Sequence, residues 1–222
     1  AATVRFPRAD TLVIESTYGG PQDFQPNRVD ATQEIQDLIK LAVSRSGKVF
    51  CPVFAVGRSQ EVMLAIDQLF KSGDVSPVTV WLDGMISEAT AIHASHPDFL
   101  NRDLRRQVLK GGEENPFNSP WFKQVDSREQ RESIINDPSP CIVLATSGMM
   151  TGGPIMEYFK NWAPELNNAL CFVGYQASGT LGRRLQSGHP EVPLVDRGQT
   201  HMIPVACNVV TIDGFSGHSD RR

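Results

Sequence analysis

The order in which apolar patterns follow one another constrains the fold more than any other feature of this sequence. Short β-favouring runs alternate with longer segments whose apolar residues recur at helical spacing. The strand-like runs are 11–17 (TLVIEST), 48–54 (KVFCPVF), 77–83 (PVTVWLD), 140–148 (PCIVLATSG) and 168–176 (NALCFVGYQ). The helix-like segments are 28–45, 57–73, 86–94, 127–136 and 153–163. Because strands separated by helices pair in parallel, the sequence predicts an α/β fold with a mostly parallel sheet flanked by helices.

Three segments fit this alternation less well. Residues 97–127 are polar and broken by Pro and Gly, which makes them the weakest point for a domain boundary. The segment GTLGRRLQSG (179–188) predicts a helical turn, and residues 190–215 are rich in β-favouring residues. We therefore expect an interruption between 97 and 127 and a β-rich tail.

Composition narrows the class of protein. The chain has 222 residues, of which 40% are hydrophobic, and this is enough for one substantial domain or two small ones. No apolar run approaches the length of about 20 residues that a membrane helix needs, so we expect no membrane partner. The four widely spaced cysteines predict buried, reduced thiols in a cytoplasmic protein: Cys51, Cys141, Cys171 and Cys207. The net charge of −4 argues against a uniformly basic nucleic-acid coat but is compatible with a local basic groove.

Both ends suggest a piece of a longer protein. The chain starts with AATVRFPRAD, without an initiator Met or a secretory signal pattern. It stops at GFSGHSDRR, inside what reads as a Gly/Ser/His loop. We therefore expect this sequence to be an excised segment.

Two residues at opposite ends of the chain are candidates for proton chemistry. Glu15 ends the first strand-like run, where a carboxylate can orient a His or accept a proton, although a solvated strand-end Glu is the commoner case. His218 lies among Gly and Ser residues, a setting that favours a working His over one buried in a core. The other histidines indicate less: His93 and His96 read as a surface pair, and two more, His189 and His201, as structural.

Two strand–turn–helix junctions could receive a phosphate. In FAVGRSQE (54–61), backbone N–H groups of residues 57–59 and the charge of Arg58 would face a bound anion. ATSGMMTGGP (145–154) repeats the arrangement with small residues. Neither matches a Walker A or dinucleotide fingerprint, so an ordinary junction remains an alternative at both places.

Five strings, taken together, carry a family resemblance. IESTYG, PVFAVGRSQE, ATSGMMTGGP, GYQASGTLGRRL and GFSGHSD follow one another in this order along the whole chain. In this they resemble the β-CASP family of metallo-β-lactamase nucleases, and in particular the archaeal proteins similar to the cleavage and polyadenylation specificity factor endonuclease. The resemblance implies a Rossmann-like β-CASP cassette over residues 20–216. Residues 1–19 and 217–222 would then belong to the metallo-β-lactamase domain into which the cassette is inserted.

The resemblance also implies a metal that this chain does not hold. Family members bind two zinc ions through an HxHxDH run, a further His and an Asp before the cassette, and another His after it. No HxHxDH run occurs in residues 1–222. We therefore expect the zinc ligands to lie outside this chain, and the isolated chain neither to hold stoichiometric zinc nor to cut RNA.

Site residues are carried over from the family motifs. Glu15 matches the acidic residue of motif A and His218 the His of motif B, which would sit beside the scissile phosphate as general acid or hydrogen-bond donor. Candidate contacts to single-stranded RNA, chosen by loop position and charge, are Arg58, Ser147, Gly148, Arg183, Arg184 and Ser219. The parent protein would act in RNA 3′-end processing or transcription termination. Its partners would be RNA, its own lactamase domain and, as a further candidate, a second copy of itself.

Two other kinds of protein remain alternatives. One is a non-catalytic β-CASP scaffold subunit of an RNA-processing complex, because some family members keep the fold without the metal ligands. The other is a nucleotide-binding α/β domain with the two junctions as phosphate cradles. The sequence leaves open whether the parent cuts internally or also trims from a 5′ end, and whether it carries KH domains.

Overall fold

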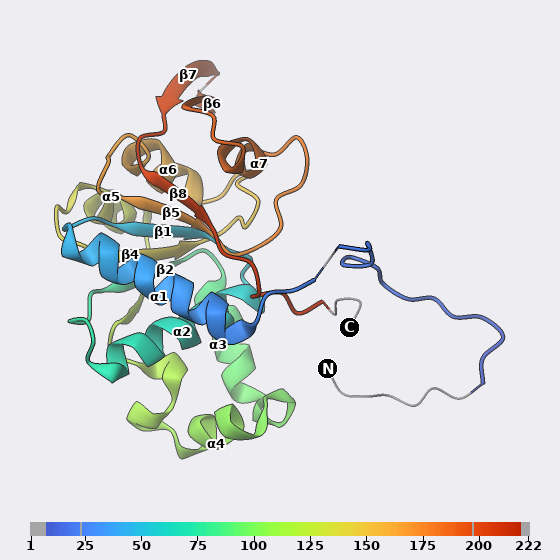
Figure 1. The fold of residues 1–222 in the computed structure, drawn as a ribbon. Helices are drawn as coiled ribbons and strands as arrows, with labels where there is room; N and C mark the ends of the chain where they lie inside the picture. The colour runs from blue at the N-terminus through green and yellow to red at the C-terminus, as the bar shows by residue number, and fades with distance from the viewer. Residues whose placement is uncertain (1–7, 23, 197, 219–222) are drawn as a thin grey trace.

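A six-stranded parallel sheet forms the centre of the fold (Figure 1). The computed structural model describes residues 8–22, 24–196 and 198–218. The strands are β1 (Val49–Pro52), β2 (Val80–Asp83), β3 (Phe122–Gln124), β4 (Ile142–Ala145), β5 (Ala169–Phe172) and β8 (Asn208–Thr211). Their order across the sheet is β3-β2-β4-β1-β5-β8, and every neighbouring pair is parallel. The predicted α/β fold with a parallel sheet is confirmed.

Helices cover both faces of this sheet. One face packs against α1 (Arg28–Ser44), α2 (Arg58–Ser72), α3 (Ile86–Ser95) and α4 (Arg102–Lys110). The other face packs against α5 (Arg128–Asn136), α6 (Ile155–Trp162) and α7 (Leu181–Gln186), and against the antiparallel hairpin of β6 (Glu191–Asp196) and β7 (Gln199–Pro204). In β1, Val49 and Cys51 point to the first layer and Phe50 to the second, as the two-residue period of a strand requires. Both faces are therefore buried, which explains why the central strands read as continuous apolar runs.

The helices begin where the sequence offers caps. The Asn27 side chain accepts a hydrogen bond from the Val29 N–H at the start of α1, and the Ser127 hydroxyl accepts one from the Gln130 N–H at the start of α5. At the end of α2, Gly73 adopts a left-handed conformation with φ +79°, which stops the helix. These local signals explain why the predicted helix ranges agree with the structure to within a few residues.

The connections from β1 and from β4 leave the sheet in opposite directions. After β1 the chain enters α2 on one face, and after β4 it enters α6 on the other. The loops that follow these two neighbouring strands therefore diverge and leave space at the carboxyl edge of the sheet. In open α/β sheets this is the place where ligands bind.

Two expectations about secondary structure are wrong. Residues 11–16 form no strand, and Leu12, Val13 and Ile14 are exposed (68%, 92% and 72%), since no strand of the described chain lies beside them to supply ladder partners. Residues 97–127, expected to interrupt the alternation of strands and helices, contain α4 and the edge strand β3, which pairs with β2. Their polar composition reflects a surface helix that buries only Leu104 and Val108, one turn apart.

The cysteines are buried, as the sequence predicts. All four cysteines are buried free thiols. Burial raises the pKa of Cys141 to about 12 and that of Cys207 to about 11, so these thiols stay protonated at neutral pH. Among the described residues, no helix is long and apolar enough to cross a membrane.

Candidate functional site

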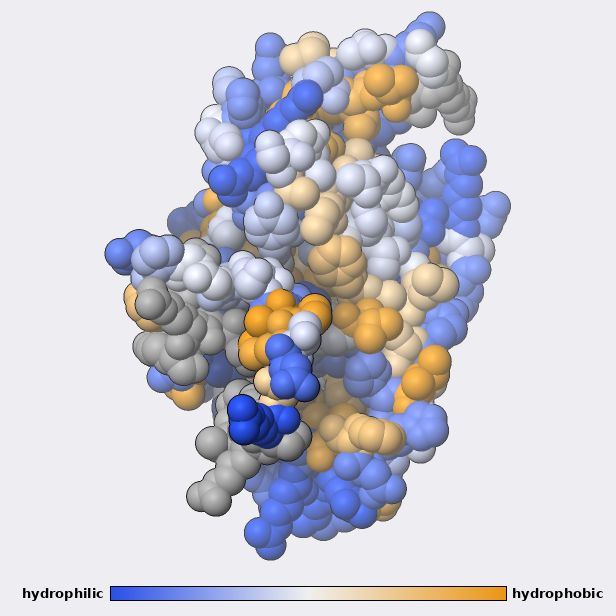
Figure 2. Space-filling model, turned by 90° about the vertical axis from the view of Figure 1, so that its right-hand side faces the viewer, coloured by the Kyte–Doolittle hydropathy of each residue, from blue (hydrophilic) through white to orange (hydrophobic). Residues whose placement is uncertain are grey.

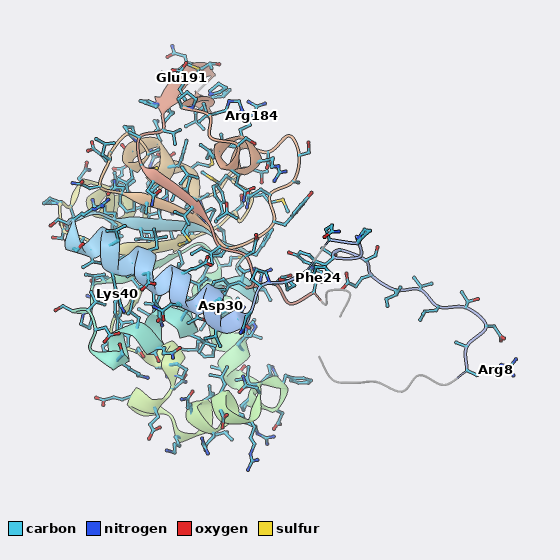
Figure 3. The ribbon with its side chains drawn as sticks, in the orientation of Figure 1. Arg8, Phe24, Asp30, Lys40, Arg184 and Glu191 are labelled. Atoms are coloured by element: carbon cyan, nitrogen blue, oxygen red, sulfur yellow. The ribbon has the colours of Figure 1, made fainter. Side chains whose placement is uncertain are left out.

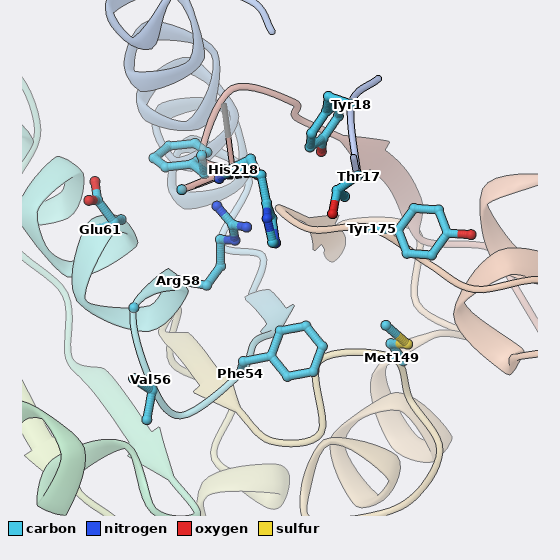
Figure 4. A pocket seen from close by; sticks show the side chains of 13 residues that line it. Thr17, Tyr18, Phe54, Val56, Arg58, Glu61, Met149, Tyr175 and His218 are labelled. Atoms are coloured by element: carbon cyan, nitrogen blue, oxygen red, sulfur yellow. Dashed lines mark hydrogen bonds between the residues drawn. The ribbon is translucent and has the colours of Figure 1, made fainter. Parts of the chain in front are cut away.

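A pocket of about 590 Å³ opens at the carboxyl edge of the sheet. Its wall comes from the loops after four strands: Phe54 to Arg58 after β1, Met149 after β4, Tyr175 after β5, and 215–218 after β8. Thr17 and Tyr18, from the N-terminal segment, close one side (Figure 4). Figure 2 looks onto this edge of the molecule and shows apolar side chains gathered near its centre, with polar side chains around them. The pocket therefore lies where the topology predicts a ligand site.

The two candidate residues for proton chemistry meet at this pocket. His218 Nδ1 lies 3.4 Å from Glu15 Oε2, and both side chains are about half exposed. The His218 backbone is held by its own N–H, which donates to the Ser216 hydroxyl (3.2 Å), and by its carbonyl, which accepts from the Gln25 amide (3.3 Å). The structure thus brings residues from opposite ends of the chain together, with the imidazole lining the pocket.

The local backbone keeps Glu15 in its charged form. The Thr17 N–H donates a hydrogen bond to Glu15 Oε2 at 3.0 Å. This bond, followed by weaker effects of the Thr17 hydroxyl and of His218, lowers the pKa of Glu15 below its ordinary value. At neutral pH Glu15 is therefore a carboxylate that can accept the Nδ1–H of His218.

Arg58 places a positive charge in the same pocket. Its Nε is buried and has no hydrogen-bond partner among the residues that the structure describes, while the side chain as a whole is half-buried. Burial lowers the pKa of Arg58, and its charge in turn helps to lower the pKa of Arg28, after burial of Arg28 itself. Arg28 is neutralised by an ion pair with Glu61 and lies 4.6 Å from the centre of the Phe215 ring. A partly buried cation with an unpaired Nε is costly, so this pocket favours an anion.

The other predicted RNA contacts lie less close to the pocket. Ser147 and Gly148 are in the loop after β4, where the Ser147 hydroxyl bonds within its own loop and Gly148 is buried beneath Phe54. Arg183 and Arg184 are exposed on α7 (Figure 3, where Arg184 is labelled) and are not among the residues that line the pocket. Ser219 lies outside the described residues. Of the predicted contacts that are described, only Arg58 lines this pocket.

The aromatic and sulfur-bearing part of the site was not predicted from the sequence. Tyr18, Phe54, Met149 and Tyr175 all line the pocket, but none was a candidate. A signal was present, because each residue lies at or just after the end of a strand-like run, inside one of the strings IESTYG, PVFAVG, ATSGMM and GYQASG. Whether these four residues meet in one pocket depends on how the strands pair, and the strings alone do not show that pairing.

The chain offers no zinc site of its own in the part that the structure describes. No group of three or more His, Cys, Asp or Glu side chains within residues 8–22, 24–196 and 198–218 could hold a metal ion. His93 uses its Nδ1 in a 2.7 Å contact with the Ala89 carbonyl of its own helix. The described side chains around the pocket therefore do not fit a zinc ion.

Comparison with known proteins establishes the family. The β-Casp domain model matches residues 59–185, more than half of the chain. The chain belongs to the β-Casp family. The family resemblance that five sequence strings indicated is thereby confirmed.

The relatives share the whole length of this chain. The transcription termination factor FttA of Methanosarcina mazei is 52% identical over 222 residues, that of Methanocaldococcus jannaschii 49% and that of Thermococcus kodakarensis 48%. Each match covers 100% of this chain but only 34–35% of the relative. The chain thus spans about a third of the length of these archaeal relatives.

Proposed function

We propose that this chain is the β-CASP part of a zinc-dependent ribonuclease that acts in RNA 3′-end processing or transcription termination. The names of its relatives and their greater length support a longer, cytoplasmic parent protein. In that parent, residues 20–216 form the β-CASP domain, while residues 1–19 and 217–222 belong to a metallo-β-lactamase domain. The zinc ions are bound by residues of that second domain, and a second copy of the parent is a further candidate partner.

The observation that carries this proposal is the meeting of Glu15 and His218 beside Arg58. Their side chains come from opposite ends of the sequence, yet Nδ1 and Oε2 are 3.4 Å apart at the rim of the pocket. A carboxylate on one imidazole nitrogen fixes the ring and leaves the other nitrogen free toward a ligand. A scaffold would not need such a pair at a pocket that also contains an unpaired cation.

The geometry supports a separate role for each of three residues in phosphodiester cleavage. Arg58 binds a non-bridging oxygen of an RNA phosphate and offsets its charge. His218 donates the proton on Nε2 to the leaving oxygen, and Glu15 positions the ring by accepting the Nδ1–H. Single-stranded RNA is the favoured substrate, because a flexible strand can bring its phosphate to the bottom of a pocket. Ser147, Gly148, Arg183, Arg184 and Ser219 remain candidates for contacts farther along the strand.

The exposed N-terminal segment supports the presence of a second domain. Leu12, Val13 and Ile14 are consecutive, so in an extended chain their side chains point to both sides. Such a segment is stable only inside a sheet that is covered on both faces. A neighbouring lactamase sheet would supply that environment and would hold Glu15 in place.

The test is cleavage of labelled single-stranded RNA by the full-length parent. We expect His218→Ala to lower the cleavage rate by about 10²–10⁴-fold, the usual contribution of a positioned acid or base. The matched control is His201→Ala, since His201 is an exposed histidine on β7 outside the pocket. A zinc chelator should abolish cleavage by the parent, and the isolated 222-residue chain should neither cleave RNA nor retain stoichiometric zinc.

The scaffold alternative gives the opposite result. A scaffold parent binds RNA or protein but cleaves nothing, and His218→Ala then changes no rate. Equal cleavage by wild type, His218→Ala and His201→Ala would likewise remove His218 from the chemistry.

A further inference from the structure

Two aromatic rings stand exposed at the mouth of the pocket. Phe54 is 44% exposed and Tyr175 is 63% exposed, although the sheet beside them has a dense core. Figure 4 shows both rings, with Met149, along the wall that faces Arg58 and His218. The pocket thus has a charged side and an apolar, planar side.

The Phe54 ring rests on a support that only glycine permits. A Cβ on Gly148 would lie 2.9 Å from the Phe54 backbone nitrogen and 3.0 and 3.1 Å from two ring carbons. Real Cβ contacts essentially never fall below 3.0 Å and are uncommon between 3.0 and 3.4 Å, so any larger residue at 148 would push the ring or the loop away. The backbone of the loop after β4 therefore lies directly against the ring.

A buried glutamine holds that support in place. The Gln176 amide donates to the Gly148 carbonyl (2.7 Å) and to the Gly174 carbonyl (3.3 Å), and Gln176 itself is 2% exposed. Gly182 of α7 approaches so closely that a Cβ there would be 1.8 Å from Gln176 Oε1. The loops after β4 and β5 and the start of α7 are thus tied together, and Phe54 is fixed on them before any ligand arrives.

We propose that Phe54 and Tyr175, with Met149 between them, bind the nucleobase next to the phosphate that Arg58 holds. This inference rests on the proposed function, since it assumes that the pocket receives RNA. Bases stack on exposed aromatic side chains regardless of sequence, because every base has a planar π-face. A ring that is already immobile loses little conformational entropy when a base stacks on it.

The size and chemistry of the pocket fit one nucleotide unit. Its volume of about 590 Å³ falls within the range of pockets that enclose small molecules. Near the rings the wall is formed by Phe54, Val56, Met149 and Tyr175, whose side chains carry only one strong hydrogen-bonding group, the Tyr175 hydroxyl, so it offers few groups that could read a base edge. The stacked base should therefore be accepted without strong preference for its identity.

The experiment measures RNA affinity of the full-length parent with abasic substrates. A set of single-stranded RNAs each lacks one base, and the position whose loss weakens wild-type binding most identifies the stacked nucleotide. We expect Phe54→Ala to weaken binding of intact RNA by about tenfold, within the range for removing one stacking partner. On the RNA that is abasic at the identified position, the same substitution should have no further effect.

Two further variants keep this test decisive. Phe54→Leu preserves apolar volume, so it folds even where Phe54→Ala does not, and it should lose the same sensitivity to the missing base. Phe99→Ala is the matched control, because Phe99 is 90% exposed and lies outside the pocket. Its affinity for intact and abasic RNA should equal that of wild type.

Other outcomes overturn the proposal. If Phe54→Leu weakens all RNAs by the same factor, including every abasic one, the ring packs against another part of the parent and not against a base. If it weakens none, Phe54 takes no part in binding. A parent that shows the abasic effect but cleaves no RNA would refute the proposed nuclease activity and leave the stacking site standing. A parent that cleaves RNA without the abasic effect would refute the stacking site and leave the nuclease activity standing.

Discussion

Two arginines near the same edge of the sheet have opposite surroundings. Arg131 of α5 donates two hydrogen bonds to Asp83, from Nε to Oδ2 (2.7 Å) and from Nη2 to Oδ1 (2.8 Å). The Tyr158 hydroxyl adds a third bond to the same carboxylate, at 2.8 Å. Arg58 has a buried Nε with no hydrogen-bond partner among the described residues.

The difference shows itself in the pKa values of the two side chains. The hydrogen bonds that Arg131 donates to Asp83 raise the pKa of Arg131, whereas burial lowers the pKa of Arg58. A cation whose charge is fully matched within the fold has nothing left to offer a ligand. An arginine without such a partner destabilises the free protein slightly. When an anion binds, it supplies the missing hydrogen bonds and the opposite charge. Arg131 therefore belongs to the fold, and Arg58 to the proposed RNA site.

Breaking the matched cluster should have the largest effect on stability. Asp83 is 1% exposed, so Asp83→Ala leaves Arg131 without its partner in a mostly buried position. We expect the free energy of unfolding to fall by about 3–5 kcal/mol, the usual cost of removing one member of a buried ion pair. Thermal unfolding of wild type and variant, with circular dichroism as the probe, measures this.

An exposed ion pair on the same helix supplies the control. Arg128 and Glu132 of α5 are 3.1 Å apart, with side chains 68% and 60% exposed. Glu132→Gln should change stability by less than about 0.5 kcal/mol, since surface pairs contribute little. Equal losses for Asp83→Ala and Glu132→Gln would mean that the Asp83 cluster is not a structural element at all.

Removing the unmatched charge should leave stability intact and weaken RNA binding. In Arg58→Met the apolar stem is kept and the buried cation is lost, so we expect the melting temperature to stay the same or rise slightly. RNA affinity should fall by about tenfold, and the slope of log affinity against log salt should become shallower by about 0.7, as expected when one phosphate contact to a single strand is lost. Titrations at several salt concentrations measure both. A variant that unfolds as easily as Asp83→Ala would show that Arg58 supports the fold instead.

The fold was accessible from the sequence because its signals are local. Periodic apolar residues in 28–45 and 57–73 and the caps beside them are enough to place α1 and α2. Strand order was not accessible, since nothing in 48–54 shows that β1 pairs with both β4 and β5. The run 11–17 has strand composition but no partner in the described chain, and composition alone does not make a ladder.

The candidate site was accessible only in part, and for a related reason. Glu15, His218 and Arg58 stood out because their residue types carry charge or protons. Phe54 and Tyr175 did not, because an aromatic residue after an apolar run is ordinarily part of a core. Only the meeting of four strand ends at one edge turns them into the wall of a pocket.

A smaller change inside the matched cluster should have an intermediate effect on stability. Tyr158→Phe removes one hydrogen bond to Asp83 and keeps the ring, which packs 5.0 Å from that of Trp162. Asp83 retains both bonds from Arg131, so we expect a loss of about 1–2 kcal/mol, the contribution of a hydrogen bond to a charged group. The outcome is read from the same unfolding transition, and a loss as large as that of Asp83→Ala would place the main support of the carboxylate on Tyr158.

The smallest effect concerns pH and the pair that joins the two ends of the chain. The hydrogen bond from the Thr17 N–H lowers the pKa of Glu15 below its ordinary value of 4.5, so the charged form persists to lower pH in the folded protein than in the unfolded chain. The contribution of Glu15 to the stability of the folded protein is present above about pH 4.5 and is lost only as the pH falls through the lowered pKa.

Glu15→Gln tests this sign directly. Glutamine cannot carry the charge that Glu15 offers to His218, and we expect RNA cleavage to slow by about tenfold, less than for loss of the His itself. Because the Thr17 hydrogen bond keeps Glu15 ionised, protonation of Glu15 should not slow the wild-type protein between pH 8 and about 5.5. Rates of the two proteins over this range provide the measurement, and equal rates at every pH would remove Glu15 from the proposed site. Glu15 is therefore expected to behave as a matched charge, like Asp83, although it is half exposed and its partner lies at the other end of the chain.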